Sequence, residues 1–208
     1  MDFPDPPDGR SDRAHTPRER ELLLQIEAIF LARGFADLRL ADLARDLNTS
    51  LSTIYRLAPS KAALIELVLD RWHRRIGAQA WTAVAAVDDP LDRLRAWLAV
   101  SADAVTARSP LLQIDLVNTP AAYELTERYN RYWINVVVHL LRDAARQGRI
   151  RRMKFELVAE VWEAAFRRAI EPGLLTRVGV SEARALRELT TMLLDGIAVD
   201  THLTHDRS

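Results

Sequence analysis

Side chains that can bind anionic oxygens are concentrated in one stretch of the chain, between residues 50 and 61. Hydroxyl groups, a guanidinium and an ammonium follow one another there at short intervals, and they belong to Ser50, Ser52, Thr53, Tyr55, Arg56 and Lys61. All of them are hydrogen-bonding groups. Together they could bind anionic oxygens of a partner from an exposed surface, provided that the surrounding elements place them on the same face.

The elements that carry these groups are predicted from apolar spacing on either side of a turn. Before the turn, apolar residues recur at intervals of three and four, which places them on one side of a helix. They are Leu40, Leu43, Ala44 and Leu47. In the turn, Asn48 can adopt the left-handed backbone conformation, and Ser50 can cap the next helix through its hydroxyl. A second helix is therefore predicted to start at about Leu51.

This second helix separates an apolar face from a polar one. Ile54 and either Leu57 or Ala58 face the first helix, and the hydroxyls and the guanidinium fall mostly on the other side. Pro59 ends the helix, and Lys61 lies in the first turn of the next one. Two short helices joined by a tight turn have the geometry in which the second helix lies in the major groove of DNA.

Three motifs of this region resemble a known family in their order and spacing. They are AIFLARGF at Ala28–Phe35, LADLARDL at Leu40–Leu47, and S-x-x-TIYR followed by PSKAAL within Ser50–Leu64. From Glu19 to Asp70, roughly a quarter of the chain, the sequence resembles the DNA-binding domain of the TetR family of transcriptional regulators. The resemblance implies an all-α fold: an N-terminal three-helix bundle with a helix-turn-helix, followed by a larger helical ligand-binding and dimerisation domain.

The predicted domains are a disordered arm at 1–16, rich in Pro and Asp, a helix-turn-helix DNA-binding domain at 17–63, and a ligand-binding and dimerisation domain at 64–203. Outside the helix-turn-helix, helices are predicted at 18–33, 61–87, 91–108, 120–146, 154–171 and 181–199, with a short apolar segment at 110–117. Pro172 and Gly179 lie between the last two helices. No segment shows sustained strand alternation.

The first of these helices is predicted to bury an apolar face and to end at a glycine. Its predicted buried residues are Leu22, Ile26, Ala28, Ile29 and Phe30. Gly34 is placed to stop the helix in a left-handed cap, and Phe35 follows as the hydrophobic contact.

The sequence departs from the TetR pattern at several positions that contact DNA in the family. TetR-like sequences usually open the next helix on a Thr or Ser, but Leu38 and Arg39 occupy that place here. Asp37 is then the candidate cap and Arg39 a candidate phosphate contact. The family also usually has a basic residue at the place of Leu51, a Gly at Ser52 and an aromatic pair near the helix end.

Roles for the predicted DNA-binding residues follow from their chemistry. The hydroxyls of Thr53 and Tyr55 contact phosphate oxygens, which fixes register without reading sequence. Lys61 adds its charge to backbone amides that already favour an anion. Leu51, Ser52 and Arg56 are the candidates for contacts with base edges or nearby phosphates, and Leu51 can meet a thymine methyl. The full predicted set is Arg39, Ser50, Leu51, Ser52, Thr53, Tyr55, Arg56 and Lys61.

Composition limits the ways in which the chain can bind its partners. Lys and Arg together number 29, as do Asp and Glu, and this neutrality argues against binding nucleic acid by bulk charge. Any DNA binding must therefore be local. The absence of Cys excludes disulfides and thiolate metal sites. Without an apolar segment of signal-peptide or membrane-spanning length, a cytoplasmic protein that does not contact membranes is the default expectation.

A second set of side chains could line a cavity with a few polar anchors, which is the usual makeup of a ligand site. The predicted ligand-binding residues are Trp97, Tyr123, Tyr132, Asn135, His139, Trp162 and Phe166. The alternative is that aromatics at helical spacing and a lone histidine among valines belong to the core, and for any single residue the core interpretation is favoured. The TetR resemblance implies that some cavity binds an unknown small-molecule effector.

The last two predicted helices repeat apolar residues at intervals of three and four. These residues are Phe155, Val158, Ala159, Trp162, Ala165, Phe166 and Ala169 on one helix, and Leu186, Leu189, Leu193 and Ile197 on the other. Two such helices from each subunit would form a four-helix interface, whereas the alternative buries them within one chain. A homodimer is favoured because a helix-turn-helix gains affinity by engaging two half-sites about one helical turn apart.

Enzyme signatures are sparse in this sequence. It contains no HExxH, Walker loop or GxSxG motif, and His202 and His205 are weak grounds for a metal. We predict no catalytic residue, cofactor or metal. The predicted function is a ligand-responsive DNA-binding transcriptional regulator, a repressor that binds a palindromic operator as a homodimer. The alternative, motivated by the neutral charge, is a TetR-like helical protein that has lost DNA binding and acts as an interaction or small-molecule-binding module.

Overall fold

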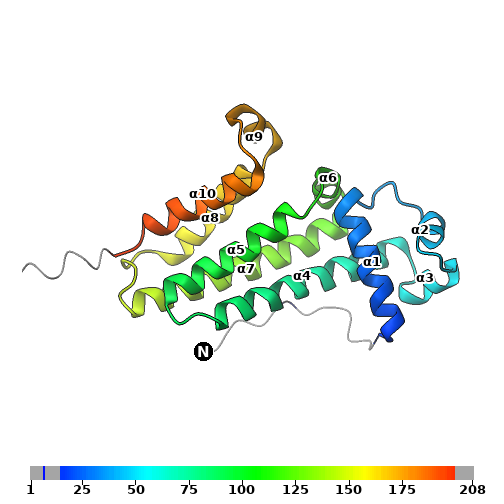
Figure 1. The fold of residues 1–208 in the computed structure, drawn as a ribbon, viewed down its shortest axis with the longest axis horizontal. Helices are drawn as coiled ribbons and strands as arrows, with labels where there is room; N and C mark the ends of the chain where they lie inside the picture. Colours follow the sequence, from blue (N-terminus) through cyan, green and yellow to red (C-terminus); the bar gives the residue numbers. More distant parts are fainter. Residues whose placement is uncertain (1–6, 8–14, 200–208) are drawn as a thin grey trace, which may run out of the picture. The chain divides into compact units, whose positions relative to one another are not determined.

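The secondary structure of the chain is helical in the computed structural model, which describes residue 7 and residues 15–199 (Figure 1). The helices are α1 (Pro17–Arg33), α2 (Leu40–Asp46), α3 (Leu51–Leu57), α4 (Lys61–Ala85), α5 (Pro90–Thr106), α6 (Pro110–Asn118), α7 (Pro120–Arg146), α8 (Phe155–Ala169), α9 (Pro172–Val178) and α10 (Glu182–Asp195). The predicted all-α fold is confirmed. The predicted arm at 1–16, apart from residues 7, 15 and 16, lies outside the described residues, as do His202 and His205.

Helix α9 was not predicted from the sequence. Pro172 and Gly179, which lie between the last two predicted helices, are the start and stop signals of a helix of their own. Gly179 adopts a left-handed conformation, with φ of 67° and ψ of 33°, and its N–H donates to the carbonyl of Leu175 over 2.9 Å. This is a common way to satisfy the last carbonyls of a helix.

The last helix ends earlier than predicted, at Asp195 instead of Val199. After Gly196 the backbone leaves the helix and runs beside the segment that follows α7. Arg151 N donates to the carbonyl of Ile197 over 3.2 Å, and Val199 N donates to the carbonyl of Arg149 over 3.0 Å. Residues 197–199 therefore form hydrogen bonds with the extended segment after α7 and do not continue the helix. Ile150 and Ala198 form an isolated antiparallel bridge there.

The chain divides into two compact units. The helix-turn-helix unit comprises residues 7, 15–77 and 107–131, and the bundle unit comprises residues 78–106 and 132–199, counting described residues. Helices α4 and α7 each contribute residues to both units. The predicted domain boundary between residues 63 and 64 falls within α4.

In the helix-turn-helix unit, α1 supplies the central apolar face. Thr16 and Glu19 form a reciprocal capping box at its start, with Thr16 N donating to Glu19 Oε2 over 2.9 Å. The buried apolar residues of α1 are Leu22, Leu23, Ile26 and Phe30. The prediction that Ala28 is buried was wrong, because Glu27 occupies the inward face and forms an ion pair with Arg75 of α4.

In the bundle unit, α10 packs against α5 and α8 (Figure 1). Aromatic rings fill the space between α4, α5 and α7. Trp97 lies 4.7 Å from Trp81 and 4.3 Å from Trp133, measured between ring centroids. Trp81 Nε1 donates to the hydroxyl of Tyr132 over 2.9 Å. Among the described residues, no helix combines the length and the apolar character needed to span a membrane.

Candidate functional site

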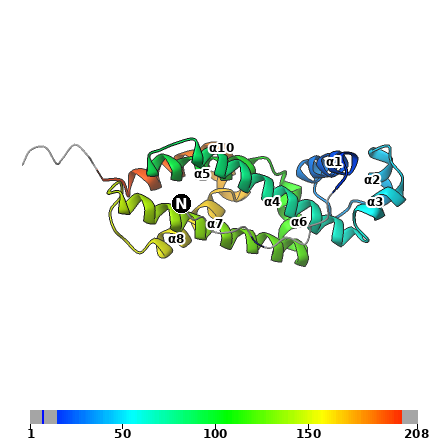
Figure 2. The same ribbon diagram turned by 90° about the horizontal axis from the view of Figure 1, so that it is seen from below.

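Helices α2 and α3 form the helix-turn-helix that the apolar spacing predicts, and they pack against each other (Figure 2). Leu43 and Ala44 of α2 and Ile54 and Leu57 of α3 are buried. Between the helices Asn48 has φ of 48°, a left-handed conformation that asparagine tolerates. The predicted turn is therefore present, and the outward face of α3 is determined by the burial of its inward face.

Three hydroxyl groups form a linked cluster at the start of α3. Ser50 Oγ accepts a hydrogen bond from Thr53 N over 3.1 Å, which is the predicted cap. The same oxygen lies 2.8 Å from Ser52 Oγ and 2.8 Å from Thr53 Oγ1. Because a hydroxyl can donate one hydrogen bond and accept others at the same time, the cluster can still bond to a partner outside the protein.

The outward face of α3 is both polar and apolar. Tyr55 is 49% exposed and Leu51 is 39% exposed, so a phenol hydroxyl and a branched apolar side chain are presented from the same helix. Ser52 is also exposed. Such a face can place hydroxyls on phosphate oxygens and an apolar group against a thymine methyl.

Two of the predicted DNA-binding cations make contacts within the chain. Arg56 Nε lies 3.6 Å from Oε1 of Glu19, a buried residue of α1, although the Arg56 side chain is 63% exposed. Lys61 Nζ donates to the carbonyl of Ala36 over 2.5 Å. Sequence reasoning missed both contacts, because their partners lie on α1 and on the connection from α1 to α2.

Arg39 differs from these cations. It is exposed at the N-cap position of α2, and within the described residues its side chain takes part in no hydrogen bond or ion pair. The candidate cap Asp37 was a wrong prediction, since no side chain caps α2. Arg39 is therefore available to an external anion at a helix start, where the backbone amides also favour negative charge.

The charge of this region is close to balanced. Residues 17–63 carry seven cationic and six acidic side chains, which gives a formal net charge of +1. Ion pairs on the surface neutralise part of the positive charge. Arg33 Nη2 lies 2.6 Å from Asp46 Oδ2, and Arg45 Nη2 lies 2.8 Å from Asp42 Oδ1. Any affinity for a polyanion must come from a few defined contacts.

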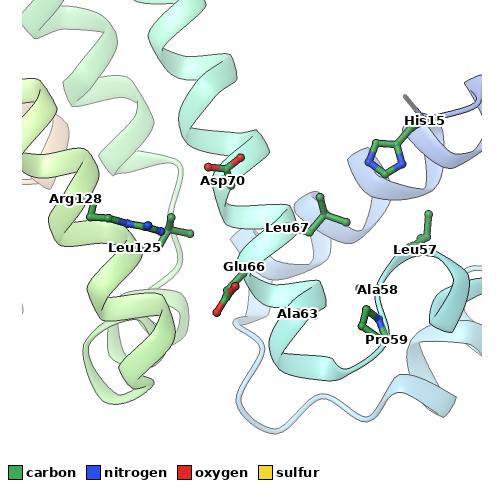
Figure 3. A pocket seen from close by; sticks show the side chains of 10 residues that line it. All are labelled: His15, Leu57, Ala58, Pro59, Ala63, Glu66, Leu67, Asp70, Leu125 and Arg128. Atoms are coloured by element: carbon green, nitrogen blue, oxygen red, sulfur yellow. The ribbon is translucent and has the colours of Figure 1, made fainter. Parts of the chain in front are cut away.

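A cleft of about 280 Å³ lies between the end of α3, the first turns of α4 and the start of α7 (Figure 3). Residues 57–59 and Leu125 give it apolar walls, and Glu66, Asp70 and Arg128 add charged groups. None of the predicted ligand-binding residues lines this cleft. Sequence reasoning could not find it, because α7 joins α4 from a distant part of the chain.

Next to this cleft, α4 and α7 share a buried polar network. The hydroxyl of Tyr129 donates to Asp70 Oδ1 over 2.8 Å, and burial together with this hydrogen bond raises the pKa of Tyr129. The ring of His73 stacks on Tyr129 at 4.3 Å, and its Nε2 is buried without a hydrogen-bond partner. Burial, and secondarily the charge of Arg108, lowers the pKa of His73 well below 6.5. His73 is therefore neutral at physiological pH.

The predicted ligand-binding residues occupy two different compact units. Tyr123 is exposed in the helix-turn-helix unit, and the others belong to the bundle unit. Trp97, Tyr132 and Trp162 are buried, which agrees with the core interpretation of each single residue. His139 is half-buried, and burial lowers its pKa.

Comparison with solved structures identifies this arrangement of helices. The sequence itself matches no protein-family model and no curated protein. A TetR-family transcriptional regulator from Agrobacterium tumefaciens superposes with a TM-score of 0.70 at 18% identity, covering 88% of this chain and 98% of that regulator. The chain has the TetR-family fold.

Two further structures of transcriptional regulators share this fold. One is a proposed regulator from Saccharomonospora viridis in complex with choline, with a TM-score of 0.74 at 17% identity, covering 89% of this chain and 100% of its own. The other is the ketosteroid transcriptional regulator KstR2 of Mycobacterium tuberculosis, with a TM-score of 0.59 at 20% identity, covering 90% of this chain and 98% of its own.

In this TetR-fold chain, α8 and α10 expose apolar residues that the sequence analysis did not select. Leu157 and Val161 of α8 and Met192 of α10 are more than half exposed. Part of the predicted apolar stripe is instead buried within the chain, namely Ala159, Trp162, Leu186 and Ile197. The two helices thus use one face internally and retain apolar side chains on their surface.

Proposed function

We propose that the protein is a DNA-binding transcriptional regulator, a homodimeric repressor that binds a palindromic operator and releases it when a small molecule binds. The observation that carries the proposal is the outward face of α3. A buried inward face and a hydroxyl-capped start leave Ser52, Tyr55 and Leu51 exposed on the second helix of a helix-turn-helix. That helix is the one that enters the major groove in such motifs.

In this proposal the side chains have distinct roles. Tyr55 and the hydroxyl cluster at the start of α3 contact phosphates and adjacent base edges. Arg39 contacts a phosphate from the start of α2. Lys61 contributes although it bonds to Ala36, because an ammonium has three hydrogens and that contact uses one. Arg56 contributes in the same way from an exposed side chain that already touches Glu19.

The homodimer is proposed to form through α8 and α10. Leu157 and Val161 are one helical turn apart on α8, and together with Met192 they give this surface the apolar character of an interface. Two half-sites engaged by one dimer double every contact that a single helix-turn-helix makes. This doubling compensates for a unit that carries little net positive charge.

The effector is proposed to be a small molecule bound in the bundle unit. The complex of the Saccharomonospora viridis protein with choline supports this proposal by analogy of fold. The candidate contacts remain the predicted residues of that unit: Trp97, Tyr132, Asn135, His139, Trp162 and Phe166. Effector binding favours a conformation in which α4, which contributes to both units, holds the two reading helices of the dimer at a separation that does not fit the operator.

Binding to DNA fragments tests the proposal directly. Purified protein is titrated against genomic fragments, including the region upstream of its own gene, at low and at moderate salt. Tyr55→Phe removes one hydroxyl and leaves the ring, so each half-site loses one hydrogen bond of about 1 kcal/mol, and the dimer binds about 30-fold more weakly. Val178→Ala, which trims an exposed side chain of α9, is the control and leaves affinity unchanged.

A second candidate function follows from the intramolecular contacts of Arg56 and Lys61. A protein that has lost DNA binding and serves as a helical interaction or small-molecule-binding module has no need of cations that are reserved for DNA at the end of α3 and the start of α4. If no fragment is bound at either salt concentration, this candidate replaces the regulator, and Tyr55→Phe leaves the remaining activity intact.

A further inference from the structure

We propose that Asp115 of α6 positions the helix-turn-helix by holding the connection between α1 and α2. One carboxylate oxygen, Oδ2, accepts hydrogen bonds from two consecutive backbone N–H groups, from Phe35 over 2.5 Å and from Ala36 over 2.9 Å. Successive N–H groups that converge in this way form a concave anion site. Here the anion is supplied by a residue distant in sequence, and it lies in the same compact unit.

The connection is built to accept this carboxylate. Gly34 has φ of 72° and ψ of −168°, a region that is essentially restricted to glycine. A Cβ at Gly34 would also collide with the carboxylate of Asp115. Phe35 is buried and packs against Phe30 with ring centroids 5.4 Å apart, which fixes the backbone on the other side of the glycine.

Ala36 is held from two directions. Its N–H donates to Asp115, and its carbonyl accepts from Lys61 Nζ at the first residue of α4. A third contact ties α6 to α1, because Ser109 N, immediately before α6, donates to the carbonyl of Leu31 over 2.8 Å. The backbone that leads into α2 is therefore fixed by α6 on one side and by α4 on the other.

The Asp115 contact affects DNA reading through the position of Arg39, the N-cap residue of α2. Arg39 follows Ala36 by three residues, so the position of its side chain depends on the backbone that Asp115 holds. Asp115 itself need not touch DNA. The inference rests on the proposed function, and it adds a residue that couples the state of α6 to the geometry of the DNA-reading surface. By thermodynamic reciprocity, DNA bound at that surface must then stabilise the Asp115 contact.

Amide hydrogen exchange in the DNA-free protein tests the contact by itself. Asp115→Ala removes the acceptor, and exchange at Phe35 and Ala36 is expected to become about 10- to 100-fold faster, the range given by losing hydrogen bonds to a charged group. Asp115→Asn keeps an oxygen acceptor and retains most of the protection. Asp103→Ala, an exposed carboxylate of α5, is the matched control and leaves exchange at both amides unchanged.

Operator affinity of the same variants tests the positioning role, using a fragment selected from random DNA. Asp115→Ala is expected to bind about tenfold or more weakly, whereas Asp115→Asn and Asp103→Ala stay near the wild type. In the wild type, operator binding slows exchange at Phe35, Ala36 and the amides of α6, and Asp115→Asn, which folds with the least change, retains this effect.

The outcomes separate the two proposals. If exchange at Phe35 and Ala36 does not change in Asp115→Ala, the contact is absent in solution and the inference is wrong. If exchange accelerates but operator affinity equals that of the wild type, the contact is structural and the positioning role is refuted. If neither the wild type nor Asp103→Ala binds any DNA, the proposed function fails and the positioning role fails with it, while the exchange result still decides whether the contact exists.

Discussion

Replacement of Arg39 by alanine is the sharpest test of the proposed contact between this surface and DNA. Arg39 is exposed at the start of α2 and makes no side-chain contact within the described residues, so the substitution disturbs no hydrogen bond or ion pair there. If each Arg39 neutralises one phosphate, a dimer loses two phosphate contacts. The slope of log affinity against log salt concentration then becomes shallower by about 1.8, because each phosphate contact contributes about 0.9.

The loss of affinity can be worked out in the same way. A charge-assisted hydrogen bond on an exposed surface contributes about 1.4 kcal/mol. Its loss weakens binding about tenfold for each half-site and about 100-fold for the dimer at low salt. The difference in DNA affinity between Arg39→Ala and the wild type should shrink as the salt concentration rises, since the lost contact is electrostatic. Fluorescence anisotropy with a selected operator over a series of salt concentrations gives both the slope and the affinity.

Arg95→Ala is the matched control for this experiment. It removes the same charge from an exposed position of α5, which belongs to the bundle unit. Its slope and affinity should equal those of the wild type. If Arg39→Ala instead binds DNA with the wild-type slope, Arg39 does not contact phosphate, and the role assigned to the start of α2 is wrong.

Three further predictions concern the backbone at Gly34, the buried His73 and the exposed face of α8. In chemical denaturation, Gly34→Ala should lower the free energy of unfolding by about 1–3 kcal/mol, because the backbone there needs positive φ and the carboxylate of Asp115 occupies the space. Gly77→Ala in α4 is the control: its methyl group meets open space, so it should raise the free energy of unfolding by about 0.5–1 kcal/mol. Burial lowers the pKa of His73, so as pH falls below 6.5 the unfolded chain binds a proton before the folded chain does. The free energy of unfolding should therefore fall by up to about 1.4 kcal/mol per pH unit below pH 6.5. His73→Phe should flatten this pH dependence, and an unchanged slope would show that His73 is not its source. If the proposed dimer forms through this face of α8, Val161→Arg and Leu157→Arg should each shift the protein to monomer in sedimentation velocity. Dimers that persist in both variants would exclude this face.

The helix-turn-helix could be predicted from the sequence because its signals are local. The spacing of apolar residues, the left-handed Asn48 and the Ser50 cap are each read within a few positions, and each is present in the structure. The exposed face of α3 then follows from the burial of Ile54 and Leu57. For the same reason the exposed Tyr55 was found without the structure.

The contacts that modify this surface could not be predicted, because their partners are distant in sequence. Glu19 meets Arg56 across the fold, and Asp115 meets Phe35 from α6. No spacing rule relates such positions. The apolar stripe of α8 shows a related limit: periodicity identified an apolar helix but not which of its faces the rest of the chain would cover.

Selection of bound sequences from random DNA with the purified protein tests whether this chain reads DNA as a symmetric dimer. A symmetric dimer should enrich a two-fold symmetric sequence whose half-sites lie about 10 base pairs apart, or a multiple of that spacing, from centre to centre. Enrichment should be lost in Tyr55→Ala. Failure of the wild type to enrich any sequence, or enrichment of a single asymmetric site, would contradict the account.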